Sequence, residues 1–327
     1  MLPNTDELAE VLLDLAVPHQ DIEEAVRLGR HVTNDPETLR ILEKAVTDLV
    51  QDMGRIRGTT AVIPALPAPS TATARFFPLY VFVAALPHIR AHHRERGIPD
   101  EVSRHTLADV GRCVAWHRRW HGTGGLLIPE WLTLHFHGEL YQLGRLQFQR
   151  SRVGARTGAS IAAAELPHGP GDAALSLHIP DFMGPLTPQA VERSLALARA
   201  FFARHYPEET YSVATCSSWL LDPQLKRHLP ADSNIVRFQE RFHLVRPPTA
   251  PGGAATSELS ATADDSGTSA VPEVPAVPDD MEPVRFVFGT TDVPLDRLPR
   301  RTVLQRAVLD HLREGGHWYV GRGWLEL

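Results

Sequence analysis

Residues 173–205, which read AALSLHIPDFMGPLTPQAVERSLALARAFFARH, decide the fold of the second half of the chain. We predict a strand over 173–179 and a helix over 188–205. The loop between them holds one glycine, three prolines and an aspartate, Asp181, within residues 180–188. A strand that leads through a loop into a long helix is typical of an α/β or α+β domain.

Further strands and helices are predicted on both sides of this segment. The strands cover 140–150, a stretch near 159–166, 211–221, 235–245, 284–289 and the end of the chain, and the helices cover 222–229 and 301–314. Polar and apolar residues also alternate through Thr133, His135 and His137, which predicts an extended segment over 133–140. We assign residues 131–327 to one mixed-sheet domain with flanking helices.

The first half has the pattern of a helical domain. Asp35 and Pro36 give an N-cap and a first-turn proline, and apolar residues then recur at three- and four-residue steps until Gly54. Similar patterns predict helices at about 6–16, 19–31, 76–95 (kinked at Pro87) and 101–121. We therefore expect an α+β protein with a helical N-terminal domain over 1–130. The length of 327 residues also suggests about two domains at roughly 150 residues each.

The formal net charge of −6 is concentrated in one segment. Residues 247–280 contain six acidic residues and no Lys, Arg or aromatic residue, and Pro, Ala, Gly, Ser and Thr dominate them. Such a segment buries too little apolar area to offset its ordering entropy, so we expect a disordered acidic insertion. The rest of the chain is near neutral and has no broad basic stretch, which argues against a nucleic-acid partner.

Cysteine usage and hydropathy predict a cytoplasmic protein. Cys113 and Cys216 are the two cysteines, and their spacing fits neither a disulfide framework nor a thiolate zinc site. The first ten residues carry acidic side chains where a signal peptide needs basic ones. The longest apolar run, residues 76–87, is shorter than the ~20 residues that span a bilayer. We expect no membrane partner.

Several phrases of the second half resemble a known family. They are 140–148 (LYQLGRLQF), 178–180 (HIP), 184–188 (GPLTP), 216–221 (CSSWLL) and 232–235 (DSNI). Together with the order of the predicted elements, they are similar to a two-domain actinobacterial family, in which a helical N-acyltransferase N-terminal domain precedes a GNAT-like C-terminal domain. The resemblance covers nearly the whole chain except the acidic insertion.

The resemblance implies an acyltransferase that moves an acyl group from a thioester donor, acyl-CoA, to an amine of a small molecule. The resemblance also leaves open an acyl carrier protein as the partner that supplies the thioester. In GNAT enzymes the strand before the central helix contacts the pantetheine arm, and the helix N-terminus receives the pyrophosphate. The residues expected to bind the donor here are Ile179, Gly184, Leu186, Thr187 and Cys216. The loop departs from the family's Arg/Gln-x-x-Gly-x-Gly/Ala pattern, because it has a single glycine and carries Asp181.

The chemistry of thioester aminolysis selects the candidate catalytic residues. The amine must lose a proton to a base, and the tetrahedral oxyanion needs hydrogen-bond donors. His135, His137 and Glu139 lie at two-residue steps, so an extended segment would point all three to one face. His178, at the end of the strand before the central helix, is a further candidate base, and Ser217 is a candidate donor of a hydrogen bond. For each histidine, a packed structural role is the alternative interpretation.

The residues leave other functions open. Cys216 has no Lys or Arg nearby in the sequence to lower its pKa, so we do not expect covalent catalysis. A non-catalytic GNAT-like protein that binds a small molecule or a partner would fit the altered loop with Asp181. A metal-dependent hydrolase would draw on the 17 histidines, but His117 and His121 lack the carboxylate of a zinc-protease helix, and we expect no metal.

Overall fold

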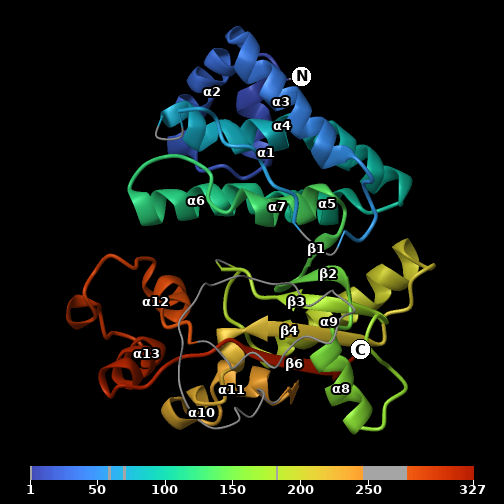
Figure 1. Ribbon diagram of the computed structural model, residues 1–327, viewed down its shortest axis with the longest axis vertical. Coiled ribbons are helices and arrows are strands. Elements are labelled where there is room, and N and C mark those ends of the chain that lie inside the picture. Colours follow the sequence, from blue (N-terminus) through green and yellow to red (C-terminus); the bar gives the residue numbers. More distant parts are fainter. Residues whose placement is uncertain (1, 58–59, 69–70, 182, 246–277) are drawn as a thin grey trace. The chain divides into compact units, whose positions relative to one another are not determined.

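The computed structural model describes residues 2–57, 60–68, 71–181, 183–245 and 278–327. The chain folds into two compact units, Met1–Leu143 and Gly144–Leu327 (Figure 1). Each has its own hydrophobic core. The expected α+β class, with a helical N-terminal part followed by a mixed sheet with flanking helices, is confirmed.

The first unit is helical. It contains α1 (Thr5–Asp14), α2 (His19–Asn34), α3 (Pro36–Val50), α4 (Ala72–Glu95), α5 (Asp100–Leu107), α6 (Asp109–His121) and α7 (Pro129–Phe136), and it ends on the short strand β1 (Leu140–Leu143). The Asn4 side chain caps α1, and the Asp35 side chain caps α3 by accepting from the N–H of Thr38. The expected helices are present, but the one predicted over 101–121 is divided into α5 and α6 at Ala108.

Helix α4 is the centre of the first unit's core. It continues through Pro78 and Pro87, and nearly all its residues from Phe76 to Leu86 are buried, where the helix contacts α2, α3 and α7. Within the described ranges α4 is the one helix long and apolar enough to cross a membrane, with 61% of its most apolar window buried inside the protein. Burial on all sides is typical of the central helix of a larger core.

The segment before β1 is helical, and the predicted extended structure over 133–140 is wrong. Pro129 occupies the first turn of α7, where its missing N–H costs nothing and its fixed φ favours the helix. The helix ends at Phe136 with His137 as its C-cap, and Gly138 follows with a φ of 75°. Four alternating residues fit a helical turn as well as a strand, so the proline at the start decides between them.

The second unit is built on a mixed sheet. Its elements are β2 (Leu146–Arg152), α8 (Ala155–Ala163), β3 (Ala173–His178), α9 (Pro188–His205), β4 (Val213–Ser218), η1 (Trp219–Leu221), α10 (Leu225–His228), α11 (Asn234–Gln239), β5 (His243–Leu244), α12 (Met281–Phe288), η2 (Leu295–Arg297), α13 (Val303–Arg313) and β6 (Gly321–Glu326). The strands follow the order β2-β3-β4-β6-β5, in which β3 and β4 are parallel and the other pairs antiparallel.

The predicted strand over 173–179, the helices over 188–205 and 301–314 and the terminal strand are confirmed as β3, α9, α13 and β6. The predicted strand over 140–150 is interrupted at Gly144 and Arg145, between β1 and β2.

Three strand predictions in the second unit are wrong. Residues 159–166 belong largely to α8, 235–239 lie in α11 and only 243–244 of that range form a strand, β5, and 284–288 lie in α12. Burial explains the last case, because Val284 packs with Val308 and Trp318 in a core that a helix completes. The local preference of Val and Phe for strands is overridden by this packing.

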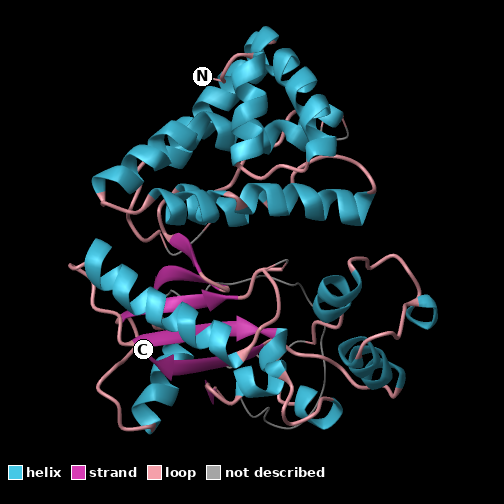
Figure 2. Ribbon diagram, turned by 180° about the vertical axis from the view of Figure 1, so that it is seen from behind, coloured by secondary structure: helices cyan, strands magenta, loops and turns pink. Residues whose placement is uncertain are grey.

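The register divides the sheet into two different faces. Side chains on one face are buried, and they include Phe148, Leu175, Leu177, Cys216 and Leu325. Helix α9 crosses the sheet on this side (Figure 2) and contacts β2. The opposite face, called the polar face below, carries half-buried or exposed polar side chains at Gln149, Ser176, His178, Thr215 and Ser217, and buried apolar ones at Ala174, Val213 and Trp324. Helix α8 contacts β6, where Trp324 Nε1 donates to Ser160 Oγ at 3.0 Å.

The predicted acidic insertion, residues 247–280, lies outside the described residues up to position 277. Its last three residues are ordered, and the prediction of disorder is wrong for them. Pro278 forms a bridge with Tyr319, and Asp280 accepts hydrogen bonds from the Trp318 N–H at 2.7 Å and from His317 at 2.8 Å.

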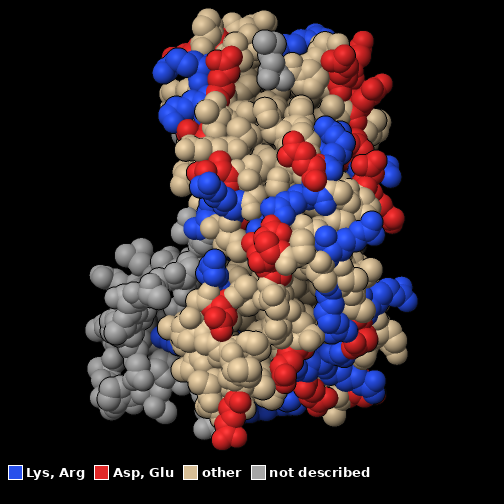
Figure 3. Space-filling model, turned by 90° about the vertical axis from the view of Figure 1, so that its right-hand side faces the viewer, with Lys and Arg blue, Asp and Glu red and all other residues tan. Residues whose placement is uncertain are grey.

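On the face drawn in Figure 3, basic and acidic side chains are interspersed.

Candidate active site

The parallel ladder between β3 and β4 ends inside the sheet. Its last pair joins Leu177 to Cys216. Beyond that pair, β3 continues to pair with β2 through His178, and β4 continues to pair with β6 through Ser218. The ladder between the two central strands therefore stops at this pair while each strand keeps its outer neighbour, as it would at a slot where a ligand pairs with main-chain groups.

His178 lies at this end of β3, on the polar face of the sheet. Its Nε2 is 3.0 Å from Oε1 of Gln149 on β2, and the ring is half-buried. An amide oxygen only accepts, so Nε2 carries the proton in this arrangement and Nδ1 is the basic nitrogen. His178 was a candidate from the sequence, and the structure adds its partner Gln149, which lies 29 positions away.

Cys216 and Ser217 are neighbours on β4 that point to opposite faces. Cys216 lies on the face crossed by α9 and is buried, and this burial raises the pKa of its thiol to about 12. Ser217 is exposed on the same face as His178. Of the two, only the Ser217 side chain is presented on the polar face.

The loop between β3 and α9 holds the other residues predicted to bind a donor. Ile179 is half-buried, Leu186 is buried, and Gly184 is exposed with a φ of 76°, a conformation that favours glycine. Thr187 is the N-cap of α9, and its Oγ1 accepts from the Ala190 N–H at 3.2 Å. The helix thus begins at the end of this loop with its positive dipole end toward it.

Arg145, which sequence reasoning did not single out, holds this loop. Its Nε donates to the carbonyl oxygen of Gly184 at 2.8 Å, and a terminal nitrogen donates to that of Pro180 at 2.9 Å. Its backbone N–H donates to Ser194 Oγ on α9 at 2.8 Å. The contacts join positions 35 to 49 residues apart, which no local pattern reveals.

The predicted cluster of His135, His137 and Glu139 lies in the first unit and is divided into two pairs. His137 Nδ1 is 3.1 Å from Glu139 Oε1, and its Nε2 is 3.0 Å from the carbonyl oxygen of Gln51. Both ring nitrogens of His137 therefore face acceptors. The second oxygen of Glu139, Oε2, is buried with no hydrogen-bond partner among the described residues.

His135 pairs instead with Asp109, at 3.3 Å between Nε2 and Oδ2. Burial lowers the pKa of His135 more than the carboxylate of Asp109 raises it. Burial alone would raise the pKa of Asp109, but His135, Arg112 and a hydrogen bond from Trp131 outweigh it and lower that pKa. The pair is a fully buried polar network.

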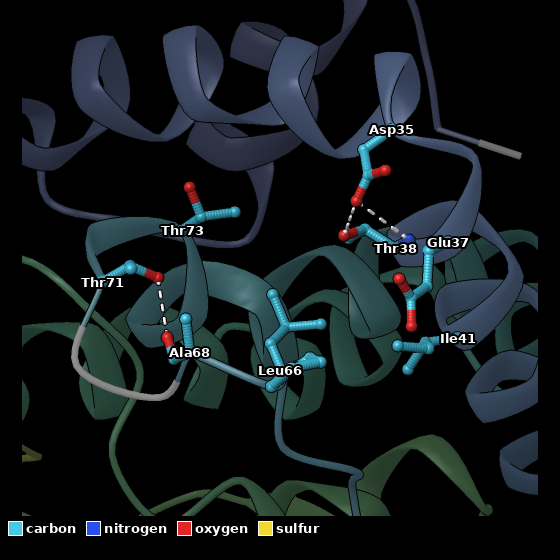
Figure 4. A pocket seen from close by; sticks show the side chains of 9 residues that line it. Asp35, Glu37, Thr38, Ile41, Leu66, Ala68, Thr71 and Thr73 are labelled. Carbon is cyan, nitrogen blue, oxygen red and sulfur yellow. Dashed lines mark hydrogen bonds between the residues drawn. The ribbon is translucent and has the colours of Figure 1, made fainter.

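A hollow in the first unit is lined by residues of α3, the start of α4 and the segment before it, drawn in Figure 4: Asp35, Glu37, Thr38, Ile41, Leu66, Pro67, Ala68, Thr71 and Thr73. The Asp35 carboxylate caps α3 there, and the hollow contains none of the predicted site residues. Across the described part of the chain, no group of three or more His, Cys, Asp or Glu side chains is placed to hold a metal ion.

Comparison with known proteins agrees with this architecture. Residues 6–138 match the model of the N-acyltransferase N-terminal domain, and residues 140–325 match that of the GNAT-like C-terminal domain. No curated protein matches the sequence.

Three similar solved structures are described as an acyltransferase mutant in complex with octanoyl-CoA, an acyltransferase in complex with decanoyl-CoA and teicoplanin, and an acyltransferase in complex with CoA and 10C-teicoplanin. Each is 38% identical to this chain, with a TM-score of 0.83, and the match covers 100% of this chain and 90% of the other. This chain therefore belongs to the two-domain acyltransferase family in which an N-acyltransferase N-terminal domain precedes a GNAT-like C-terminal domain.

Proposed function

We propose that this protein transfers an acyl group from acyl-CoA to an amine of a small molecule. The observation that carries the proposal is the end of the β3–β4 ladder at Leu177 and Cys216, beside the loop that leads into α9. The backbone groups released there suit the amide groups of a pantetheine arm, and the N-terminus of α9 suits a pyrophosphate. The solved relatives are described with CoA or acyl-CoA in the same fold.

We assign His178 the role of general base. The amine nitrogen attacks the thioester carbonyl carbon, a new C–N bond forms, and the proton lost by nitrogen passes to Nδ1 of His178. The tetrahedral oxyanion then collapses, the C–S bond breaks, and the departing thiolate takes up the proton from His178, which leaves the imidazole neutral again. Ser217, exposed on the same face, is the candidate hydrogen-bond donor to the oxyanion.

The acceptor and the source of the thioester are finer parts of the proposal. Two of the similar structures are described with teicoplanin or 10C-teicoplanin, which supports a small-molecule acceptor. The same pantetheine thioester is presented by an acyl carrier protein, so an acylated carrier protein is the alternative donor. A cytoplasmic location, where acyl-CoA is made and used, completes the proposal.

The test is transfer by the purified protein with a panel of acyl-CoAs and one acylated carrier protein, in the presence of a small-molecule amine. We expect amide product and free CoA in equal amounts. We expect His178→Ala to lower kcat by about 10²-fold or more, as loss of a general base does, and the control His168→Ala, in the loop before β3, to leave it unchanged. If the protein neither binds nor turns over any of these donors, acyl transfer is refuted. Full activity of His178→Ala would remove that residue from the mechanism.

A further inference from the structure

The Arg145 side chain holds two points of the loop between β3 and α9. The carbonyl oxygens that its guanidinium engages, at Pro180 and Gly184, belong to residues four apart, so a single planar group spans most of the loop. Five donors in a fixed plane make arginine suited to binding two acceptors at once.

The backbone at Arg145 is itself fixed against α9. The preceding residue, Gly144, has a φ of 72°, and a Cβ there would lie 2.8 Å from Ser194 Oγ. The Ser194 hydroxyl is buried on α9 and accepts from the Arg145 N–H at 2.8 Å. The close approach requires glycine at 144, and it places the start of the arginine side chain at a set distance from the helix.

The loop needs such support because of its composition. Its prolines at 180, 185 and 188 supply no N–H for an anion, and Asp181 adds a negative charge. Carbonyl oxygens that face an incoming phosphate repel it, and a planar trans peptide fixes a carbonyl opposite to the N–H of the next residue, which for Pro180 is the N–H of Asp181. A guanidinium that binds two of these oxygens turns them toward itself and brings a positive charge into the loop.

We propose that Arg145 is the positioning residue of the donor loop. Its two hydrogen bonds hold the loop in the conformation that receives the pyrophosphate of acyl-CoA. In glycine-rich pyrophosphate loops the backbone reaches such a conformation because glycine is flexible, whereas here a side chain holds it. This inference rests on the proposed function, and it predicts that Arg145 matters only for donors that carry the pyrophosphate.

The test compares two donors that bear the same acyl chain, acyl-CoA and acyl-pantetheine, because the second lacks the pyrophosphate and the nucleotide. In Arg145→Lys the charge remains, but an ammonium lacks the planar fork that spans both carbonyls. We expect the KM for acyl-CoA to rise about tenfold with kcat little changed, and kcat/KM for acyl-pantetheine to stay at the wild-type value. Unchanged use of acyl-pantetheine also shows that the variant is folded.

Arg152→Lys is the matched control. Arg152 is the last residue of β2, the strand that follows Arg145, and it donates to the carbonyl oxygen of Gly171 at 2.9 Å, away from the donor loop. Arg152→Lys should leave the KM and kcat for acyl-CoA and the kcat/KM for acyl-pantetheine at the wild-type values. The inference is overturned if Arg145→Lys behaves as wild type while Arg145→Ala does not, since charge alone would then suffice. It is equally overturned if both donors lose activity to the same extent. If wild-type protein uses neither donor, the proposed function itself fails.

Discussion

The thiol of Cys216 lies beside the end of the β3–β4 ladder, yet its environment excludes a role as nucleophile. Burial raises its pKa to about 12, so the reactive thiolate is scarce at neutral pH. We predict that Cys216→Ala keeps kcat within about twofold of wild type. We also expect wild-type protein to resist iodoacetamide and to form no acyl-enzyme on mass spectrometry after mixing with acyl-CoA. A stable protein adduct on Cys216 that turns over with the amine would contradict this.

Gln149 sets the chemistry of His178 through one hydrogen bond of 3.0 Å. In Gln149→Glu a carboxylate replaces the amide next to Nε2–H and raises the pKa of His178 in the variant. A base works in its neutral form, so the acidic limb of the kcat–pH profile should move to higher pH by about one unit. Gln149→Met, which removes the acceptor and adds no charge, should lower kcat without that shift. An unmoved limb in Gln149→Glu would mean that His178 does not titrate in the rate-limiting step.

Sequence reasoning found residues that bear chemistry but not the residues that orient them. The family phrases selected His178, Thr187 and Cys216, which the fold places near the end of the ladder and the start of α9. It missed Gln149 and Arg145, because their roles depend on contacts with residues 29 to 39 positions away. The expected grouping of His135 with His137 and Glu139 failed once α7 proved helical, since a strand was required to align them.

At the scale of elements, Thr187 serves α9 in a way that can be separated from donor binding. Its Oγ1 caps the helix at Ala190 N, and Thr302 caps α13 in the same manner at Gln305 N. We predict that Thr187→Ala and Thr302→Ala each lower the free energy of unfolding by about 1 kcal/mol in urea titrations, as loss of an N-cap does.

Of these two variants, only Thr187→Ala should raise the KM for acyl-CoA, and Thr187→Ser should restore both properties. Equal KM values for acyl-CoA in Thr187→Ala and Thr302→Ala would mean that Thr187 acts only as a helix cap.

Elements with a strong local start were predicted from sequence, and elements decided by packing were not. α3 and α9 begin with an N-cap and a proline at the first turn, and both are found where the pattern placed them. α12 has alternating Val284, Phe286 and Phe288, which favours a strand, and yet eight residues form a helix because Val284 completes a core with distant partners. Such partners are invisible to a local pattern.

At the scale of the whole molecule, buried histidines make the first unit sensitive to acid. Three histidines of the first unit, His93, His117 and His135, have a lowered pKa, and burial is the main cause for each. The value for His93 falls to about 3. A histidine with a folded pKa below its unfolded value binds more protons when unfolded, so its stabilising effect is present above about pH 6.5 and is lost as pH falls toward 3.

We therefore predict that acidification unfolds the first unit before the second. From pH 7 to pH 5, His93 alone lowers the free energy of unfolding of the first unit by up to about 2 kcal/mol. Trp116, Trp120 and Trp131 report on the first unit and Trp219, Trp318 and Trp324 on the second, so variants that keep one set distinguish them by fluorescence. His93→Asn should weaken the pH dependence of the free energy of unfolding of the first unit. One coincident transition for both sets at pH 5 would contradict the prediction.

The point at which β3 and β4 part has a consequence for how this protein tolerates change. Peptide groups are identical at every residue, so a slot formed by main-chain N–H and C=O after Leu177 and Cys216 does not depend on which side chains the two strands carry there. Substitutions along this edge can accumulate while the thioester arm is still held. Selection for a new acyl chain or a new amine is thereby free to act on the surrounding side chains, with recognition of the common carrier left intact.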